Sequence, residues 1–220
     1  GRMTSSVAHE IRNPVGIIST NAQVLGRHAD PAVRDIAEDI REETGRLGLI
    51  IRRFLDLSEP QGHYRRFDFE SVIAQAVDNM KRETGEREIE WTEEYGAGGC
   101  EIEGDPDRLM SVVVNVIDNA IQSIREKGRI GVETRLREGR FQVRIQDTGA
   151  GMDRKTLTSA KEPFFSQKDQ GTGLGLAIAD RIIAEHGGRL DIVSAPGEGT
   201  SVLIALPIPP EEPEEDGVHG

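Results

Sequence analysis

The sequence predicts an α+β protein in which a helical hairpin is followed by an α/β sandwich domain. Two observations predict the hairpin: apolar residues recur at three and four residue steps through residues 1–58, and a short polar turn at residues 26–31 interrupts them. A third predicts the sandwich, because helix-like and strand-like patterns alternate over residues 66–208. The two patterns are separated by a stretch that contains Pro and Gly. We therefore expect two domains joined by a linker at residues 59–65.

The first helix is expected over about residues 4–27. Its apolar stripe consists of Val7, Ile11, Ile18, Ala22 and Leu25. His9 precedes Ile11 by two residues, which turns a helix by roughly 200°, so His9 should point away from the stripe. Glu10 follows His9 directly, and Asn13 lies beside it one turn later. Pro14 removes one backbone hydrogen bond and should kink or loosen the turn after His9.

Two interpretations of His9 are open at this point. A histidine on a polar helix face is often only a solvated side chain. With a carboxylate next to it in sequence, it is also a candidate for phosphorylation by the protein itself. Phosphorylation of His9 is the better hypothesis only if the rest of the chain can bind a phosphoryl donor.

The second helix is expected over about residues 31–58. Its apolar residues form a nearly complete heptad seam that only Glu43 breaks: Val33, Ile36, Ile40, Leu47, Ile50, Phe54 and Leu57. The short turn makes the two helices antiparallel. Because one partner helix cannot fully cover either narrow stripe, two hairpins should pair into a four-helix bundle. We therefore expect a homodimer.

The second domain is expected to contain strands and helices in alternation. The strand-like runs lie near residues 65–69, 87–94, 99–103, 130–136, 141–146, 189–194 and 201–206. The helical patterns lie near residues 70–84, 106–127 and 174–187. The middle helix begins with an acid at the N-cap position and a proline in the first turn, Asp105 and Pro106. A Gly-rich stretch of about 25 residues precedes the last helix.

Composition excludes several classes of function. The net charge of −12 argues against unaided binding to nucleic acid or to an anionic membrane. A single cysteine, Cys100, excludes an intramolecular disulfide.

No apolar run reaches the roughly 20 residues of a membrane helix, so we expect no membrane contact in this stretch and a cytoplasmic location. A helix already under way at Thr4 leaves room for an upstream sensor or membrane segment. The Pro-rich acidic tail, residues 209–220, is predicted to be disordered.

Two glycine-rich motifs point to nucleotide binding. Asp147 follows a strand and precedes Gly149 and Gly151, so a backbone turn could press against a flat ligand there while the carboxylate accepts from the amino group of adenine. A plain turn is the alternative. The second motif opens a helix, where successive N–H groups could cradle phosphate: Gly171, Thr172, Gly173, Leu174, Gly175 and Leu176. It is neither a Walker motif nor the dinucleotide fingerprint.

Two further features lie between and before these motifs. Asn115 and Asn119 are four residues apart on one helix face, where their amide oxygens could bind Mg²⁺, although helix asparagines also often face solvent. Phe164 and Phe165 stand in an otherwise polar loop that also contains Lys168. This loop could be a lid whose lysine reaches a phosphate, or a hydrophobic anchor with an incidental lysine.

Taken in order and spacing, these blocks resemble the H, N, G1, F and G2 boxes of sensor histidine kinases. The resemblance covers nearly the whole chain and is closest to the nitrogen-regulatory type. It implies a dimerisation and phosphotransfer hairpin followed by an ATP-binding domain of the GHKL (Bergerat) fold. It also implies ATP and Mg²⁺ as cofactors, and as partner the receiver domain of a response regulator in two-component signalling.

The resemblance implies roles for particular residues. His9 would be the phosphoacceptor, Glu10 the base that polarises its imidazole, and Asn13 a residue that positions water for dephosphorylating the partner. Asn119 would ligate Mg²⁺ with support from Asn115. Asp147 would read adenine with a water held by Thr200. The pocket would be shaped by Gly149, Gly151, Gly171, Gly173 and Gly175, and completed by Phe165, Lys168, Thr172, Leu174 and Leu176.

The chain departs from the family pattern in the N and F boxes. Gln122 and Ser123 stand where many relatives have a lysine or an aromatic residue, and Gln167 replaces a frequent threonine. The implied function is ATP-dependent autophosphorylation of His9 and transfer to the regulator, with phosphatase activity toward that regulator. The alternatives are an ATP-binding dimeric scaffold or pseudokinase, and a GHKL-type ATPase, in which a glutamate would be expected at the position of Asn115.

Overall fold

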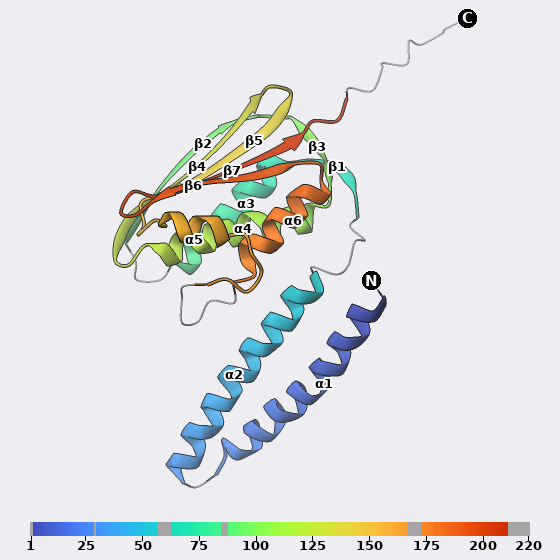
Figure 1. The fold of residues 1–220 in the computed structure, drawn as a ribbon, viewed down its shortest axis with the longest axis vertical. Coiled ribbons are helices and arrows are strands. Elements are labelled where there is room, and N and C mark those ends of the chain that lie inside the picture. Colours follow the sequence, from blue (N-terminus) through green and yellow to red (C-terminus); the bar gives the residue numbers. More distant parts are fainter. Residues whose placement is uncertain (1, 29, 57–62, 85–87, 167–172, 211–220) are drawn as a thin grey trace, which may run out of the picture. The chain divides into compact units, whose positions relative to one another are not determined.

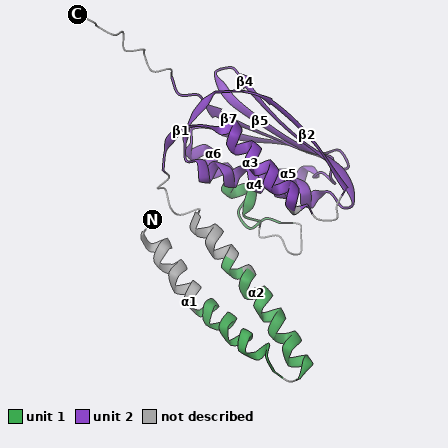
Figure 2. Cartoon of the chain, turned by 180° about the vertical axis from the view of Figure 1, so that it is seen from behind, with its two compact units in different colours: residues 1–61, 160–178 green, residues 62–159, 179–220 purple. Residues whose placement is uncertain are grey.

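The computed structural model describes the chain except residues 1, 29, 57–62, 85–87, 167–172 and 211–220. The chain divides into two compact units, residues 1–61 with 160–178 and residues 62–159 with 179–220 (Figure 2). Most of the predicted linker and most of the acidic tail lie outside the described residues, so the domain bounds and the disorder of the tail stay predictions. In the part of the chain that is described, no helix has both the length and the apolar character that a membrane span requires.

The first unit contains the two predicted antiparallel helices, α1 (Arg2–Leu25) and α2 (Pro31–Asp56), which lie side by side (Figure 1). Ala22 and Ala37 are fully buried in this hairpin, and Thr44 is nearly so. Their small side chains allow the helices to approach closely, since interhelical distance depends on the residues at the contact.

The turn between α1 and α2 is closed by local hydrogen bonds. The N–H of Gly26 donates to the carbonyl of Ala22 at 2.8 Å, which ends α1. Asp30 caps α2, because its Oδ1 accepts from the N–H of Ala32 at 2.9 Å. Pro31 occupies the first helical position, where its missing N–H costs nothing. The predicted polar turn is therefore confirmed.

The second unit is built on a five-stranded sheet with the strand order β2-β4-β5-β7-β6 (Figure 1). The strands are β2 (Glu88–Gly96), β4 (Lys127–Arg137), β5 (Arg140–Asp147), β6 (Arg189–Ala195) and β7 (Gly199–Pro207). Only the β2–β4 pair is parallel, and the other neighbours are antiparallel. A second, two-stranded sheet pairs β1 (Arg65–Asp68) with β3 (Glu101–Gly104).

Four helices lie in the described part of the chain that follows β1. They are α3 (Phe69–Glu83), α4 (Pro106–Ser123), α5 (Arg154–Ser159) and α6 (Gly175–Glu185). The helices α3 and α4 pack against each other on one face of the five-stranded sheet (Figure 1). Asp68 caps α3 and Asp105 caps α4. The cap at Asp105 is the one that the sequence predicts. This α+β arrangement is the fold class that the sequence predicts.

Two predictions about the helices are corrected. The helix predicted over residues 106–127 ends at Ser123, because Ile124 takes an extended backbone conformation, with φ −90° and ψ 120°. Ile124 is only 2% exposed, and a Cβ on Gly128 would lie 3.0 Å from its side chain. Burial of this isoleucine therefore takes precedence over helix propensity. The short helix α5 carried too little apolar periodicity to be predicted.

Alternation along the strands decides which side chains enter the core. On β5, Phe141, Val143 and Ile145 are buried, and the residues between them face the other side of the sheet. Successive side chains of a strand point to opposite faces, so Asp147 continues the buried series. The last residue of β5 thus brings a carboxylate to the face of the sheet that α3 and α4 cover.

Candidate nucleotide-binding site

Asp147 is the acidic residue of the predicted nucleotide site, and only 4% of its surface is exposed. Its Oδ1 accepts two hydrogen bonds, from the N–H of Gly149 at 2.8 Å and from the hydroxyl of Ser123 at 2.9 Å. A buried carboxylate is stable only when it is hydrogen-bonded or paired with a cation. The two donors hold the carboxylate in one orientation at the end of β5.

The turn after Asp147 is pressed between two other segments. A Cβ on Gly149 would lie 1.9 Å from Oγ of Ser123, and a Cβ on Gly151, where φ is +65°, would lie 1.9 Å from the carbonyl of Ala195. The backbone is also tied on both sides, because Ala150 donates to the carbonyl of Ser123 at 3.1 Å and accepts from the N–H of Gly197 at 2.7 Å. Both predicted glycines are therefore required by close backbone approach.

Thr200 lies beside Asp147, as the family resemblance implies. The two residues are directly paired in the β5–β7 ladder. The hydroxyl of Thr200 is 3.0 Å from that of Ser194 on β6. Gly199, which the sequence reasoning missed, has φ +80° and a Cβ position only 2.0 Å from the carbonyl of Asp147. Its place between Gly197 and Thr200 was the signal that could have revealed it.

Asn115 and Asn119 lie one turn apart on α4, and both are half-buried. The side-chain amide of Asn119 donates to the backbone carbonyl of Asn115 at 2.8 Å. Among the described residues no cluster of three His, Cys, Asp or Glu side chains could hold a metal. A pair of amide oxygens fits Mg²⁺ that is bound mainly by waters and phosphate, and it does not form an all-protein cage.

The second glycine motif is described only in part. Lys168, Gly171 and Thr172 lie outside the described residues. Gly173 has φ +63°, and a Cβ there would lie 2.5 Å from the carbonyl carbon of Phe164, whose N–H donates to Gly173 at 3.0 Å. The two ends of this loop are therefore held together by backbone contacts.

The other predicted residues of the loop differ in exposure. Phe164 is 62% exposed, whereas Phe165 is half-buried. Leu174 is fully buried, and Gly175 and Leu176 are half-buried at the start of α6. Of the two aromatic side chains, that of Phe165 is therefore the less exposed to solvent.

The predicted phosphoacceptor segment lies on α1. His9, Glu10 and Asn13 are all within the helix, which continues through Pro14 to Leu25. The side chains of His9, Glu10 and Asn13 lie outside the described part of the structure. Their roles and the predicted kink at Pro14 therefore stay predictions.

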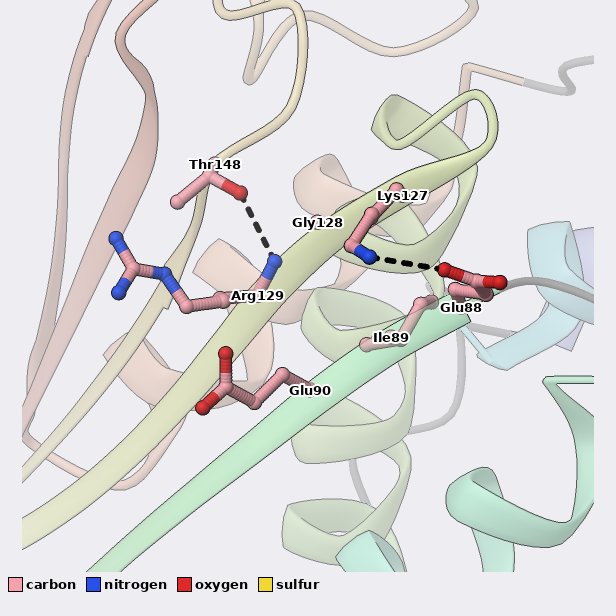
Figure 3. A pocket seen from close by; sticks show the side chains of 7 residues that line it. All are labelled: Glu88, Ile89, Glu90, Lys127, Gly128, Arg129 and Thr148. Carbon is pink, nitrogen blue, oxygen red and sulfur yellow. Dashed lines mark hydrogen bonds and ion pairs between the residues drawn. The ribbon is translucent and has the colours of Figure 1, made fainter.

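A cavity of about 600 Å³ lies at the ends of β2 and β4 (Figure 3). Its walls are formed by Glu88, Ile89, Glu90, Lys127, Gly128, Arg129 and Thr148. Lys127 pairs with Glu88 at 3.1 Å, and the N–H of Arg129 donates to the hydroxyl of Thr148 at 2.9 Å. None of the predicted site residues lines this cavity. Thr148 lines the cavity, whereas Asp147, the residue before it, does not.

A second buried polar cluster, which the sequence patterns do not reveal, surrounds His186. The imidazole is 5% exposed, and its Nε2 accepts from the N–H of Asp105 at 3.0 Å. The ring of Tyr64 stacks on it with a centroid distance of 4.8 Å. Asp105 also accepts from the N–H of His63 at 2.9 Å. The cluster thus attaches His63 and Tyr64, at the end of the predicted linker, to the start of α4 and the residue that follows α6.

Comparisons with known proteins agree with this architecture. Residues 104–210 match the family described as "Histidine kinase-, DNA gyrase B-, and HSP90-like ATPase", and residues 1–62 match the "His Kinase A (phospho-acceptor) domain". The sensor histidine kinase ZraS of Klebsiella oxytoca is 34% identical over 99% of this chain and 48% of its own length. The chain spans about half the length of the first curated relatives that it matches.

Two solved structures share the fold. The mycobacterial sensor histidine kinase MprB is 30% identical with a TM-score of 0.57, over 67% of this chain and 99% of that one. The histidine kinase ThkA in complex with the response regulator protein TrrA is 26% identical with a TM-score of 0.68, over 97% of this chain and 63% of that one. The chain belongs to the sensor histidine kinases of two-component systems, with a phosphoacceptor hairpin and a GHKL-type ATP-binding domain.

Proposed function

We propose that this chain uses ATP to phosphorylate its own His9 and then passes the phosphoryl group to an aspartate in the receiver domain of a response regulator. The observation that carries the proposal is the buried Asp147, held by two donors at the end of β5 in the segment that matches the ATPase family. A carboxylate in this position accepts from the exocyclic amino group of adenine and repels the carbonyl of guanine.

The residues around Asp147 bind the rest of the nucleotide. Thr200 holds a water beside the carboxylate, and Gly149 and Gly151 let the backbone approach the flat base. Gly173 lies just before α6 and Gly175 begins this helix, and the backbone N–H groups of a helix N-terminus favour phosphate. Lys168, Gly171 and Thr172 belong to the same proposal on the strength of the family motif. Phe165 and the buried Leu174 support the loop by packing.

Mg²⁺ is bound by the N box and by the nucleotide phosphates. Asn119 supplies an amide oxygen from α4, and Asn115, one turn earlier, supports it. When it is bound, the ion neutralises charge that develops on the phosphates. Because the described residues offer amides and no acid cluster, we expect weak Mg²⁺ binding without nucleotide.

The phosphoryl transfer uses His9 as nucleophile and Glu10 as base. One imidazole nitrogen forms a bond to the γ-phosphorus while the bond from phosphorus to the bridging oxygen of ADP breaks, and the electron pair leaves with ADP. The proton on the other imidazole nitrogen passes to Glu10, which makes the ring more nucleophilic. The ATP-binding domain has to reach His9, so we expect motion about the linker. Phosphatase activity that depends on Asn13 stays a prediction.

The working form is a homodimer that binds its regulator on the hairpin. Several residues of the predicted seam are exposed in the single chain: Ile18, Leu25, Ile36 and Leu47. Exposed apolar positions at seam spacing favour a second hairpin as the partner. The structure of ThkA with TrrA supports a receiver domain as the second partner of this family. A cytoplasmic location of this part of the protein stays a prediction.

The proposal is tested by incubating the chain with γ-labelled ATP and Mg²⁺. We expect a label that is labile in acid and stable in alkali, absent from His9→Ala and strongly reduced in Asp147→Asn. His28→Ala is the matched control, because His28 lies in the turn of the same hairpin, and it should keep the label. Label that persists in His9→Ala would contradict the assignment of the phosphoacceptor. Nucleotide binding without label would indicate the scaffold reading, and release of phosphate without label would indicate an ATPase.

A further inference from the structure

Ser123 joins the end of α4 to the turn that follows Asp147. Its hydroxyl is 2.9 Å from Oδ1 of Asp147, its carbonyl accepts from the N–H of Ala150, and its side chain fills the space that a Cβ on Gly149 would need. These three contacts involve one half-buried residue, 24 positions before the carboxylate that it contacts.

We infer that Ser123 is a positioning residue for adenine recognition, because its hydroxyl orients the carboxylate of Asp147 toward the exocyclic amino group of the base. The inference rests on the proposed binding of adenine by Asp147. It adds a residue that acts through the carboxylate and does not itself touch the nucleotide.

The hydroxyl of Ser123 has one proton and two acceptors within reach. It lies 2.7 Å from the backbone carbonyl of Ala120, one turn earlier, and 2.9 Å from Asp147. A hydrogen bond to a charged acceptor is stronger than one to a neutral acceptor, so the bond to the carboxylate is preferred. The carboxylate can accept about four hydrogen bonds, and Ser123 and Gly149 provide two of them, both at Oδ1.

The same helix contains a natural control. Ser111 is also half-buried on α4, and its hydroxyl makes the same bond to a carbonyl three residues earlier, Arg108, at 2.7 Å. No bond from the Ser111 hydroxyl to a carboxylate is recorded in the described structure. Replacing Ser111 with alanine therefore reproduces the loss of the helix bond and leaves Asp147 unaffected.

The test compares two nucleotides that differ only in the group that Asp147 reads. Binding of ADP and of purine riboside diphosphate, which lacks the exocyclic amino group, is measured by titration calorimetry with Mg²⁺ for the whole chain. We expect Ser123→Ala to weaken ADP binding by about tenfold and to leave binding of the analogue unchanged. Ser111→Ala should change neither. If autophosphorylation is also followed, KM for ATP should rise in Ser123→Ala while kcat changes little.

The possible outcomes distinguish a failure of the inference from a failure of the proposed function. Equal weakening of both nucleotides in Ser123→Ala would mean that Ser123 only stabilises the helix end, and it would overturn the inference. An unchanged preference for ADP in Ser123→Ala, together with its loss in Asp147→Asn, would also overturn the inference but leave the function standing. If the unmodified chain shows no preference for ADP over the analogue, adenine reading by Asp147 itself is wrong.

Discussion

Single residues in this protein show how a buried polar group can be kept and used. Asp147 and His186 are both almost fully buried, and each is held by named partners from distant segments. Asp147 accepts hydrogen bonds as a carboxylate at the predicted binding site. His186 accepts from the N–H of Asp105 through Nε2, so Nδ1 carries the proton and donates to the carbonyl of Ile182 at 2.7 Å.

The environment of His186 favours the neutral imidazole. Burial lowers the pKa of His186, and this effect outweighs the opposing hydrogen bond to Ile182. The charged groups around the ring are Arg108, Asp105 and Glu185, of which Arg108 lowers the pKa further and the two acids raise it. Protonation would also place a hydrogen on Nε2, where the N–H of Asp105 now donates. The folded protein therefore binds this proton less readily than the unfolded chain does.

This difference predicts that the folded protein loses stability in mild acid. A histidine whose pKa is lowered by folding contributes stability above its unfolded value of about 6.5, and the contribution is lost as pH falls below that value. We expect the melting temperature to fall between pH 7.5 and pH 5, and to fall less steeply in His186→Gln. His28→Gln is the control, because His28 is exposed in the hairpin turn. Equal slopes in the unmodified chain and His186→Gln would contradict the prediction.

Among the secondary-structure elements, the helix cap that the sequence predicts is Asp105, and the structure shows Asp68 in the same role. Asp68 and Asp105 both precede a helix and accept from two N–H groups of its first turn. The two caps differ in the partner of the other oxygen, which accepts from the nearby hydroxyl of Ser71 in Asp68 and from the distant N–H of His63 in Asp105. Burial alone would raise the pKa of Asp105, but hydrogen bonds from Arg108, His63 and Asp107 outweigh it and lower the pKa. This carboxylate therefore joins α4 to the start of the domain.

The two caps should differ in their effect on stability. We expect Asp68→Ala to lower the free energy of unfolding by about 1 kcal/mol, the usual cost of losing a cap. Asp105→Ala should cost about 2–3 kcal/mol, because it also leaves the N–H of His63 without an acceptor. Chemical denaturation of the two variants measures both values. Equal losses would show that the bond to His63 contributes nothing to stability.

The elements also show where sequence patterns lose information. The long heptad patterns predicted α1 and α2 to within two residues at each end. The end of α4 was wrong by four residues, because the burial of Ile124 depends on what packs around it. The six-residue helix α5 was missed because less than two turns cannot display a periodic apolar face.

For the whole molecule, the seam residues of the hairpin indicate that a single chain is incomplete. Ile36 is 59% exposed although it belongs to the apolar seam of α2. A second hairpin would cover two copies of it in each dimer. Burial of a fully exposed isoleucine contributes roughly 1.5–3 kcal/mol, so covering the exposed part of both copies favours association by a few kcal/mol.

We expect Ile36→Glu to raise the dissociation constant of the dimer by roughly 100-fold or more. Analytical ultracentrifugation over a range of concentrations measures the change. Arg34→Glu is the control, since Arg34 is also exposed, lies two residues away on another face of α2 and undergoes a larger change of charge. Dissociation of both variants to the same degree would attribute the effect to charge and not to the seam.

The sequence by itself determined the order of the elements other than α5, the place of the glycine motifs and the family, because these depend on periodicity and on short stretches of neighbouring residues. It also predicted Asp147 and Thr200 as neighbours, although only through the family resemblance. The tertiary structure decided that Ser123 contacts Asp147, that Gly149 is required by that contact, and that His186 lies beneath Tyr64. Strand register and helix packing bring these residues together, and neither can be read from the residues adjacent to each one in the chain.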